Sequence, residues 1–552
     1  MRRLLVWLFA IVLVGAPFPA RAAAIGTWGI DLSDQDRSVK PGDDFAMYQN
    51  GGWFRRTELK PGQSASAYWR DVRVAGTSRI DEMMANLDGA DPAKTDRIEA
   101  LVSAFHRSAR QEVVDARGLK PLQPILAKIR AVRNRRDFAE MMGAAEGPGV
   151  LRPIAARLIP GRNPYHVNIV QDQRDPSRYA VYITQAGLIL PGPEYYLDPS
   201  FKDQKAAYQA AVTAMLRRIG WADPERYAQR IVDLETEIAK ASSTHEQQRD
   251  LSGNYHRITL AGLGRHAPGF DWAAFFKGAD LPDDALIAVD SPEAAGKIAA
   301  VYARASLDVL KAKAAVGTAF VDAVRLDSRT YGLYRDFAGS VLPGILVSPT
   351  RQLDITNLVE DSIQDAISAV YVKRYFLPTV KGKGQAMAEM MRDALDRRIS
   401  NSEWLSPEGR RLAHEKIAAM QISVGYPDKL EDYRGLVVKE DDLFGNATRA
   451  ATFAWRKQVA RLKQPVDRSQ WALTPFYAQI PAYTPTTTGA DTEPTGRPPN
   501  SVQPTTPVST PPNVPPPAAP PTTEAAASVY YPNYAAARRT GAAWTASRSS
   551  WS

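Results

Sequence analysis

The sequence predicts a mainly α-helical protein with a small β component and a disordered C-terminal tail. Three observations support this fold class. Apolar residues recur at helical spacing through most of residues 31–471, and one pair of segments alternates as a β-hairpin does. After about Thr474 the composition changes to proline, threonine and alanine with few aliphatic side chains. Such a tail buries too little apolar surface to offset the entropy lost on ordering.

The first 24 residues are predicted to be a signal peptide. Two arginines precede an apolar run at residues 4–15, and small residues follow it. The run is shorter than the ~20 residues that span a bilayer. Candidate cleavage sites follow Ala22 and Ala24, and an uncleaved anchor is the alternative. We therefore expect an exported protein, periplasmic or extracellular, with no stable membrane span after cleavage.

The clearest predicted helix starts at residues 223–225 (DPE). This triplet offers a capping side chain, a proline for the first turn and an acid near the positive end of the helix dipole. Tyr227, Ile231, Leu234 and Ile238 then form one apolar stripe, which we assign to the core. A similar stripe lies at Tyr208, Val212, Met215, Leu216 and Ile219, and further helices are predicted in the intervals 94–115, 296–325, 356–376, 383–401 and 407–420.

The β component is a predicted hairpin. Residues 166–172 (HVNIVQD) and 179–185 (YAVYITQ) alternate apolar and polar side chains around a polar RDPS turn. No repeat with a period of 20 to 50 residues is visible, which argues against a solenoid.

Three regions follow from these patterns: a signal peptide at 1–24, a folded region at 25–474 and a disordered tail at 475–552. The tail contains PPNVPPPAAPP, which favours stretches of polyproline II helix.

Composition excludes several classes of function. The 552 residues are 44% hydrophobic and 23% charged, with a net charge of +9. The densest basic cluster, residues 133–136 (RNRR), is short and precedes Asp137, so no basic strip for nucleic acid is present. A solvated basic surface explains the charge, and a weak attraction to anionic cell-envelope polymers is the alternative.

The chain has no cysteine, which excludes disulfides, thiolate zinc sites and cysteine nucleophiles. Any metal must be held by His, Asp or Glu. A helical zinc-hydrolase site needs two histidines four residues apart with a glutamate after the first. The two His-Glu pairs, at His245 and His414, lack the second histidine and are interpreted as surface polar pairs.

Other catalytic motifs are also missing. GQSAS at Gly62 lacks the second glycine of a nucleophile elbow, and KGKGQ at Lys381 lacks the spacing of a phosphate-binding loop. No dinucleotide fingerprint follows a predicted strand. From the residues alone, we therefore identify no catalytic, cofactor-binding or metal-binding residue, and the substrate-binding residues stay unknown.

Five segments, in order, resemble the neprilysin family of zinc metallopeptidases, which includes the endothelin-converting enzymes. Together they cover about 31 to 475. They are KPGDDFAMYQNGGWFRRTELKPG (40–62), QAGLILPGPEYYL (185–197), AVYVKRYF (369–376), SVGYPDKLEDY (423–433) and PVDRSQWALTP (465–475).

Within these motifs several residues have a scaffold interpretation. Residues 51–52 (GG) suit a tight turn before a tryptophan, and residues 191–193 (PGP) break a strand. Tyr195 and Tyr196 are then expected to pack with their polar ends in water. Residues 425–427 (GYP) are expected to end a short strand in a rigid turn.

The resemblance implies a two-lobed, mostly helical fold around a chamber that admits peptides and small proteins. It also implies an H-E-x-x-H helix with a downstream glutamate as zinc ligands, and an N-A-Y-Y motif that holds the substrate. In the family these elements follow the position of Pro475. Here residues 481–484 (PAYT) are a faint echo of N-A-Y-Y, and no zinc motif follows. The expected architecture is therefore incomplete.

The family's arginine for the substrate carboxylate is also missing, because Ala67 stands at about its position. Arg70 lies nearby but does not match the motif. No functional residue is carried over from the family, and zinc is expected only in complete family members.

Three hypotheses follow. In the first, the gene belongs to an exported zinc endopeptidase, and this chain is a truncated or frame-slipped, inactive form. In the second, it is a non-catalytic module that binds peptides or the cell envelope. In the third, an unrecognised site makes it an active peptidase. The sequence does not determine peptide specificity or oligomeric state.

Overall fold

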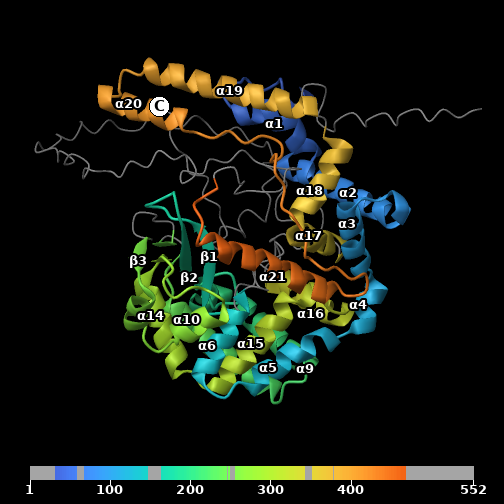
Figure 1. Ribbon diagram of the computed structural model, residues 1–552, viewed down its shortest axis with the longest axis vertical. Helices are drawn as coiled ribbons and strands as arrows, with labels where there is room; N and C mark the ends of the chain where they lie inside the picture. Colours follow the sequence, from blue (N-terminus) through green and yellow to red (C-terminus); the bar gives the residue numbers. More distant parts are fainter. Residues whose placement is uncertain are drawn as a thin grey trace, which may run out of the picture. The chain divides into compact units, whose positions relative to one another are not determined.

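The structure, a computed structural model, describes residues 32–58, 68–146, 163–244, 247–248, 255–341, 351–376 and 378–467 (Figure 1). The predicted signal peptide and tail lie outside these residues. Contacts along the chain separate two compact units, Met1–Ser66 and Ala67–Ser552.

Most of the described elements are helices, in agreement with the predicted fold class. The helices of the first part are η1 (Leu32–Asp34), α1 (Phe45–Arg56), α2 (Tyr68–Asp88), η2 (Pro92–Lys94), α3 (Arg97–Ser108), α4 (Gln111–Arg117), η3 (Lys120–Leu122), α5 (Gln123–Ala131), α6 (Arg135–Ala144), α8 (Glu194–Leu197), η5 (Pro199–Phe201), α9 (Lys202–Arg218) and α10 (Pro224–Ala241). The helices of the second part are α12 (Leu260–His266), α13 (Trp272–Gly278), α14 (Pro292–Arg304), α15 (Leu307–Val321), η6 (Ala323–Arg325), α16 (Ser328–Val341), α17 (Arg351–Ser362), α18 (Gln364–Tyr375), α19 (Pro378–Ser400), α20 (Pro407–Ala418) and α21 (Leu443–Arg461).

The first unit packs η1 against α1. Gly51 and Gly52 lie inside α1 and are buried, so the predicted tight turn at this position is wrong. A Cβ on Gly52 would lie 2.6 Å from the carbonyl oxygen of Ser33, and one on Gly51 would lie 2.6 Å from the Cβ of Asp36. The glycines therefore serve close packing of η1 rather than chain reversal.

In the second unit, the predicted apolar stripes belong to the core. Tyr208, Val212 and Met215 are buried on α9, and Ile231 and Ile238 are buried on α10. Three predicted intervals are divided in the structure: 94–115 becomes α3 and α4, 296–325 becomes α14, α15 and η6, and 356–376 becomes α17 and α18.

The predicted cap of α10 is wrong. Asp223 has a left-handed backbone with φ of 48°, and its side chain makes no capping hydrogen bond. The proline and the glutamate that follow it occupy the first turn as expected. The start of this helix therefore depends on Pro224 and on the helix dipole, not on a side-chain cap.

The second unit contains one mixed sheet with the strand order β1-β2-β4-β3. The predicted hairpin is confirmed, because β1 (Tyr165–Gln171) pairs antiparallel with β2 (Tyr179–Gln185). β4 (Ile287–Val289) runs parallel to β2, and β3 (His256–Ile258) pairs antiparallel with β4. Each of these two strands has three residues, too few to show the alternation that reveals a strand in the sequence. The run before Gly425, expected to be a strand, has no regular structure.

The close approach of α6 and α13 depends on two glycines. A Cβ on Gly143 of α6 would lie 2.0 Å from the carbonyl oxygen of Phe275, and one on Gly278 of α13 would lie 2.0 Å from that of Glu140. Relieving so short a contact would require the carbonyl oxygen to move, and it could move only if the two helices separated. Each glycine therefore makes space for the backbone of the opposite helix.

Helices α19 and α20 form an antiparallel pair that lies outside the core (Figure 1). Within the described residues, nothing between 372 and 425 belongs to the large apolar core of the second unit. The next helix, α21, returns to that core, where Trp455 Nε1 donates a hydrogen bond of 2.8 Å to the carbonyl oxygen of Ala279.

Replacing Gly143 with alanine is expected to lower the free energy of unfolding by about 1–3 kcal/mol, because the added methyl group forces α6 and α13 apart. Gly332→Ala is the matched control. It lies inside α16 with no atom within 4 Å of its added Cβ, so it is expected to raise stability by about 0.5–1 kcal/mol. Urea unfolding of both variants measures the difference. Equal stability of the two variants would contradict the packing argument.

Candidate functional site

The described residues do not assemble a zinc-hydrolase site. No three His, Asp or Glu side chains within the described ranges lie close enough together to hold a metal ion. His245 lies outside those ranges, and the sequence around it lacks the second histidine. These residues therefore do not fit the zinc that the family resemblance implies, and they support no chemical step through a metal.

His414 takes part in the contact between α19 and α20. Its Nδ1 lies 2.5 Å from Asp396 Oδ1, and its Nε2 lies 3.3 Å from Ser400 Oγ. Both ring nitrogens thus face side chains of α19. This geometry suits a structural histidine, and Glu415, the glutamate that follows it, pairs instead with Arg411.

Ser103, His106 and Asp88 are the residue types of a catalytic triad, but the contacts among them do not follow the order that a triad requires. Ser103 Oγ donates a hydrogen bond of 3.0 Å to Asp88 Oδ1, and His106 Nδ1 lies 2.9 Å from Asp88 Oδ2. A serine nucleophile needs the histidine as its direct partner. Here both groups contact the carboxylate instead. Burial raises the pKa of Asp88, but hydrogen bonds from His106 and Ser103 outweigh it and hold the pKa below its usual value. The cluster joins α2 to α3.

The most deeply buried charges lie around Glu235 of α10. Lys313 Nζ of α15 is 3.1 Å from Glu235 Oε1, and the two side chains are 1% and 0% exposed. Tyr196 and Tyr208 donate hydrogen bonds of 2.5 and 2.8 Å to Glu235 Oε2. The amide of Leu190 donates to the Tyr196 hydroxyl at 3.0 Å. One carboxylate therefore joins α8, α9, α10 and α15.

This arrangement corrects the expectation that both tyrosines of the QAGLILPGPEYYL motif keep their polar ends in water. Tyr196 is buried, and burial together with the nearby Glu235 raises its pKa well above the usual value. The phenol therefore stays neutral and acts as a hydrogen-bond donor. Tyr195 is only half-buried, and its ring packs against that of Phe201 at a tilt of 34°.

The sequence indicates this cluster through charged residues that stand within apolar helix faces, a pattern that belongs to no catalytic motif. Glu235 falls on the apolar stripe of α10, one residue after Leu234 and four after Ile231. Lys313 interrupts a run of small apolar residues in α15. A charged residue within a buried helix face requires a partner, because an unpaired buried charge is costly.

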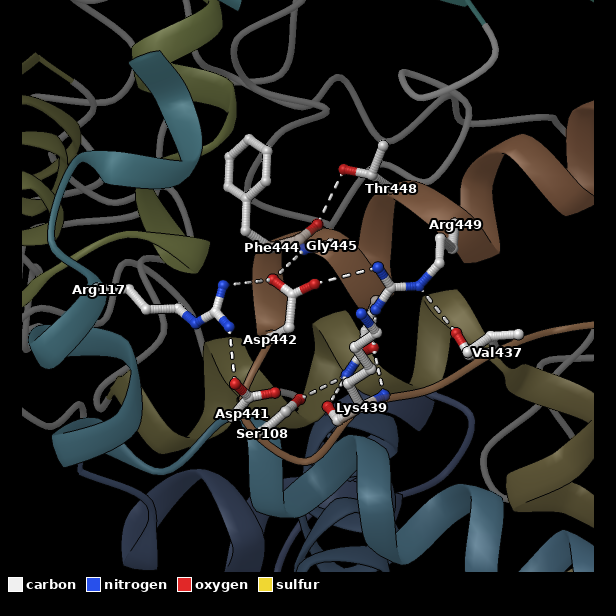
Figure 2. Close-up of polar contacts among 11 residues, drawn as sticks. Ser108, Arg117, Val437, Lys439, Asp441, Asp442, Phe444, Gly445, Thr448 and Arg449 are labelled. Atoms are coloured by element: carbon white, nitrogen blue, oxygen red, sulfur yellow. Dashed lines mark hydrogen bonds and ion pairs between the residues drawn. The ribbon is translucent and has the colours of Figure 1, made fainter. Parts of the chain in front are cut away.

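A second polar cluster fastens the start of α21 to the early part of the unit (Figure 2). Asp442 caps α21 by accepting a hydrogen bond of 3.0 Å from the Gly445 amide. The same carboxylate accepts from Arg117 at 3.1 Å and from Arg449 at 3.0 Å. Arg117 also contacts Asp441 at 2.8 Å. Residues more than 320 positions apart are thereby joined.

Asn446 extends this cluster into the core. Its Nδ2 donates hydrogen bonds to Ser108 Oγ at 3.0 Å and to the Lys439 carbonyl at 2.7 Å. Asn446 and Ser108 are both fully buried. Every charged group of the cluster has an opposite charge beside it, so the cluster suits a structural joint rather than a binding site for a free carboxylate.

One carboxyl has a pKa in the range of a general acid. Burial raises the pKa of Asp290 to about 6, although the Ser291 amide donates to it. The residue follows β4 and precedes α14. No group of metal-binding side chains surrounds it within the described part of the chain. Burial at the end of a strand explains the shift without a catalytic role.

A groove of about 610 Å³ lies between α6, α13 and α21. Its charged lining consists of Arg136, Lys277, Lys463, Asp280 and Asp283. Lys277 pairs with Glu140 at 2.9 Å, outside the groove lining. Both signs of charge are present, which suits the two ends of a peptide better than a simple anion.

Comparison with known proteins shows which family this chain resembles. The sequence model of peptidase family M13 matches residues 41–427. The endothelin-converting enzyme homolog of Locusta migratoria is 24% identical over 82% of this chain and 65% of its own length. Endothelin-converting enzyme 1 of Mus musculus is 22% identical over 80% of this chain and 59% of its own length. The chain thus spans less than two thirds of these curated relatives.

Solved structures share the fold. The Mycobacterium tuberculosis zinc metalloprotease Zmp1, crystallised with an inhibitor, is 27% identical with a TM-score of 0.72, over 82% of this chain and 67% of that one. PepO from Lactobacillus rhamnosis has a TM-score of 0.66 at 18% identity, over 79% and 68%. The latter likeness concerns the fold alone.

Breaking the buried ion pair is expected to destabilise the protein strongly. Glu235→Gln or Lys313→Met is expected to cost about 3–5 kcal/mol of unfolding free energy, since each leaves a buried charge without its partner. The combined variant Glu235→Leu and Lys313→Met is expected to cost less than either single change. Denaturant unfolding measures all three variants.

The matched control for this measurement is Glu237→Gln on the same helix. Glu237 pairs with Lys240 at 2.7 Å, and the two side chains are 53% and 59% exposed, so the loss is expected to stay within about 1 kcal/mol. A Lys313→Met variant no less stable than this control would contradict a structural role for the buried pair.

Proposed function

Since this chain belongs to peptidase family M13, we propose that it derives from an exported zinc metalloendopeptidase of peptides or small proteins, and that the 552-residue chain is itself inactive. One observation carries the proposal. The family match covers residues 41–427, yet none of the six histidines of the sequence belongs to an H-E-x-x-H motif. That motif supplies two of the three protein ligands in a helical zinc-hydrolase site.

The geometry of the described residues supports the inactive assignment. The three polar clusters around Asp88, Glu235 and Asp442 satisfy their charges internally. None of them aligns a nucleophile, a base and an oxyanion donor around a common point, as a hydrolytic site requires. The matched region therefore acts as scaffold in this proposal.

The proposal includes an origin for residues after 475. Proline, threonine, alanine and arginine without periodicity are typical of a GC-rich coding sequence read out of frame. A different frame after codon 475 is then expected to encode an H-E-x-x-H helix and a downstream E-x-x-x-D. Nucleotide sequence in which every frame lacks both motifs would reject this origin.

Export is part of the same proposal. It is supported by the signal-peptide pattern of residues 1–24. Among the helices that the structure describes, none has the length and apolar character needed to cross a bilayer. The periplasm or the extracellular space is the proposed location.

The second candidate function is a binding module for peptides or the cell envelope. The groove between α6, α13 and α21 favours it, since Arg136 and Lys463 face the same hollow as Asp280 and Asp283. A module of this kind needs the helical region to fold unaided. Its tail would act as a spacer.

The purified chain is expected to bind zinc only substoichiometrically and to leave a mid-length peptide intact. Zinc content after dialysis and mass spectrometry of the peptide measure both. His414→Ala is expected to change neither result, because His414 joins α19 to α20. Peptide hydrolysis that chelators abolish would overturn the proposal and favour an unrecognised active site.

Limited proteolysis separates the two candidate functions. A module that folds unaided is expected to leave a resistant fragment that ends near residue 470, because α21 is fastened by Asp442 and by Trp455. N-terminal sequencing and mass spectrometry define the fragment. Rapid digestion throughout residues 68–467 would argue against the module and for a fragment that cannot fold alone.

A further inference from the structure

The groove of about 610 Å³ between α6, α13 and α21 has walls that core contacts hold in place. Gly143 and Gly278 let α6 and α13 approach so closely that a Cβ on either would lie 2.0 Å from a backbone oxygen of the other helix. Trp455 Nε1 of α21 donates a hydrogen bond of 2.8 Å to the carbonyl oxygen of Ala279, the residue after α13. The walls are therefore fixed without a ligand, as in most small-molecule sites.

Four charged side chains line this groove without a partner among the described residues. Two are basic, Arg136 and Lys463, and two are acidic, Asp280 and Asp283. All four are exposed, and none makes an ion pair or a side-chain hydrogen bond within the part of the chain that the structure describes. The bases and the acids come from different elements. A ligand that carries both signs of charge can contact both sets at once.

Asp280 stands where a helix end of this geometry usually has glycine. Its amide donates to the Lys277 carbonyl at 3.2 Å. The Leu281 amide donates to the Phe276 carbonyl at 3.0 Å, which closes α13. The backbone of Asp280 is left-handed, with φ of 57°, a conformation that glycine adopts without strain and aspartate less readily. The turn therefore does not require a carboxylate here, and a strained residue of this kind indicates a functional role.

Arg136 occupies the first turn of α6, where the helix dipole favours an acid instead of a base. Its neighbour Arg135 has a structural role, because it donates hydrogen bonds of 2.6 and 2.5 Å to the carbonyl oxygens of Tyr302 and Ala305 at the end of α14. Arg136 has no such contact and lines the groove. Its guanidinium is therefore available to a carboxylate, to which it can donate two parallel hydrogen bonds.

The uncharged lining of the groove is apolar. It consists of Ala273, Ala274, Leu281, Pro282 and Val459. A simple anion meets two acids in this groove and a simple cation meets two bases, and neither ligand uses the apolar surface. A short peptide with free ends has a carboxylate, an ammonium group and aliphatic side chains, so it matches all three parts of the lining. A tripeptide is of the size that hollows of ~300–1,000 Å³ bind.

We propose that this groove binds a short peptide by its two free ends. Arg136 and Lys463 hold the terminal carboxylate, and Asp280 and Asp283 hold the terminal ammonium group. The aliphatic side chains of the peptide lie against Leu281 and the residues beside it. This inference rests on the binding module of the proposed function and names its ligand. The peptide is bound and released intact, because the groove supplies charges and apolar contact but no reacting group.

Titration calorimetry of the full-length chain with leucyl-alanyl-leucine tests the proposal. The tripeptide with both ends free is expected to bind. Acetylation of its amino end removes the charge that the two aspartates meet, and amidation of its carboxyl end removes the charge that the two bases meet. Each modification is expected to weaken binding roughly 10-fold or more, and raised salt is expected to weaken binding of the free tripeptide.

The decisive variants are Arg136→Gln and Asp280→Gly. Arg136→Gln is expected to bind the free tripeptide roughly 10-fold more weakly and the amidated form as the unaltered chain does, because the partner charge is already absent. Asp280→Gly is expected to lose affinity while its urea midpoint stays equal or rises, since glycine removes the backbone strain. A merely structural role for either residue would not produce these two patterns.

The matched controls are Arg133→Gln and Asp284→Asn. Both residues are exposed, lie within three positions of a proposed contact residue and are outside the groove lining. Each control is expected to bind the free tripeptide within about threefold of the unaltered chain. Circular dichroism and urea unfolding show whether all four variants fold.

Three outcomes would overturn the assignment of the groove: no heat of binding with the free tripeptide, equal affinity for the free and blocked forms, or variants that bind as the controls do. Failure of the proposed inactivity has a separate reading. Mass spectrometry of the recovered tripeptide shows whether it was cleaved, and cleavage that chelators abolish would refute inactivity without bearing on the affinity differences.

Discussion

A single buried carboxylate sets the arrangement of the helical unit. Glu235 has no access to water, so its charge must be met by protein groups, and three different elements supply them. Lys313 fixes the position of α15 relative to α10, while the tyrosines fix α8 and α9. The clusters at Asp88 and Asp442 act elsewhere in the unit, the first between α2 and α3 and the second between α4 and the start of α21. The aligned helices then present the apolar stripes that form the core.

Much of the fold follows from local patterns, and the exceptions have physical causes. The β1–β2 hairpin and helices α9 and α10 were predictable because their apolar period is long and regular. The turn expected at Gly51 was wrong because glycine also allows close helix packing, which the sequence does not distinguish from chain reversal. At Asp223 the backbone is left-handed instead of the extended conformation usual for a capping residue, and its side chain makes no capping hydrogen bond.

The polar clusters were less predictable than the helices. Glu235 could have been noticed as a charge on an apolar stripe, but its partner Lys313 lies 78 positions further on (313 minus 235) and no local pattern joins them. Arg117 and Asp442 are still more distant in sequence. Family resemblance agrees with the family match at residues 41–427, yet it did not reveal that Tyr196 of one motif donates a hydrogen bond to a buried, ion-paired carboxylate instead of facing solvent.

The joint at Asp442 has a consequence for synthesis on the ribosome. Asp442 is synthesised more than 320 residues after its partner Arg117, so the contacts that hold α21 form late. The slow search for distant partners therefore falls near the end of the synthesis of this unit. Val466, whose amide donates to the Ser177 carbonyl at 3.1 Å, completes that closure. Everything that these late contacts require is encoded before residue 468. The position of each partner in the sequence therefore sets when its contact can form during synthesis.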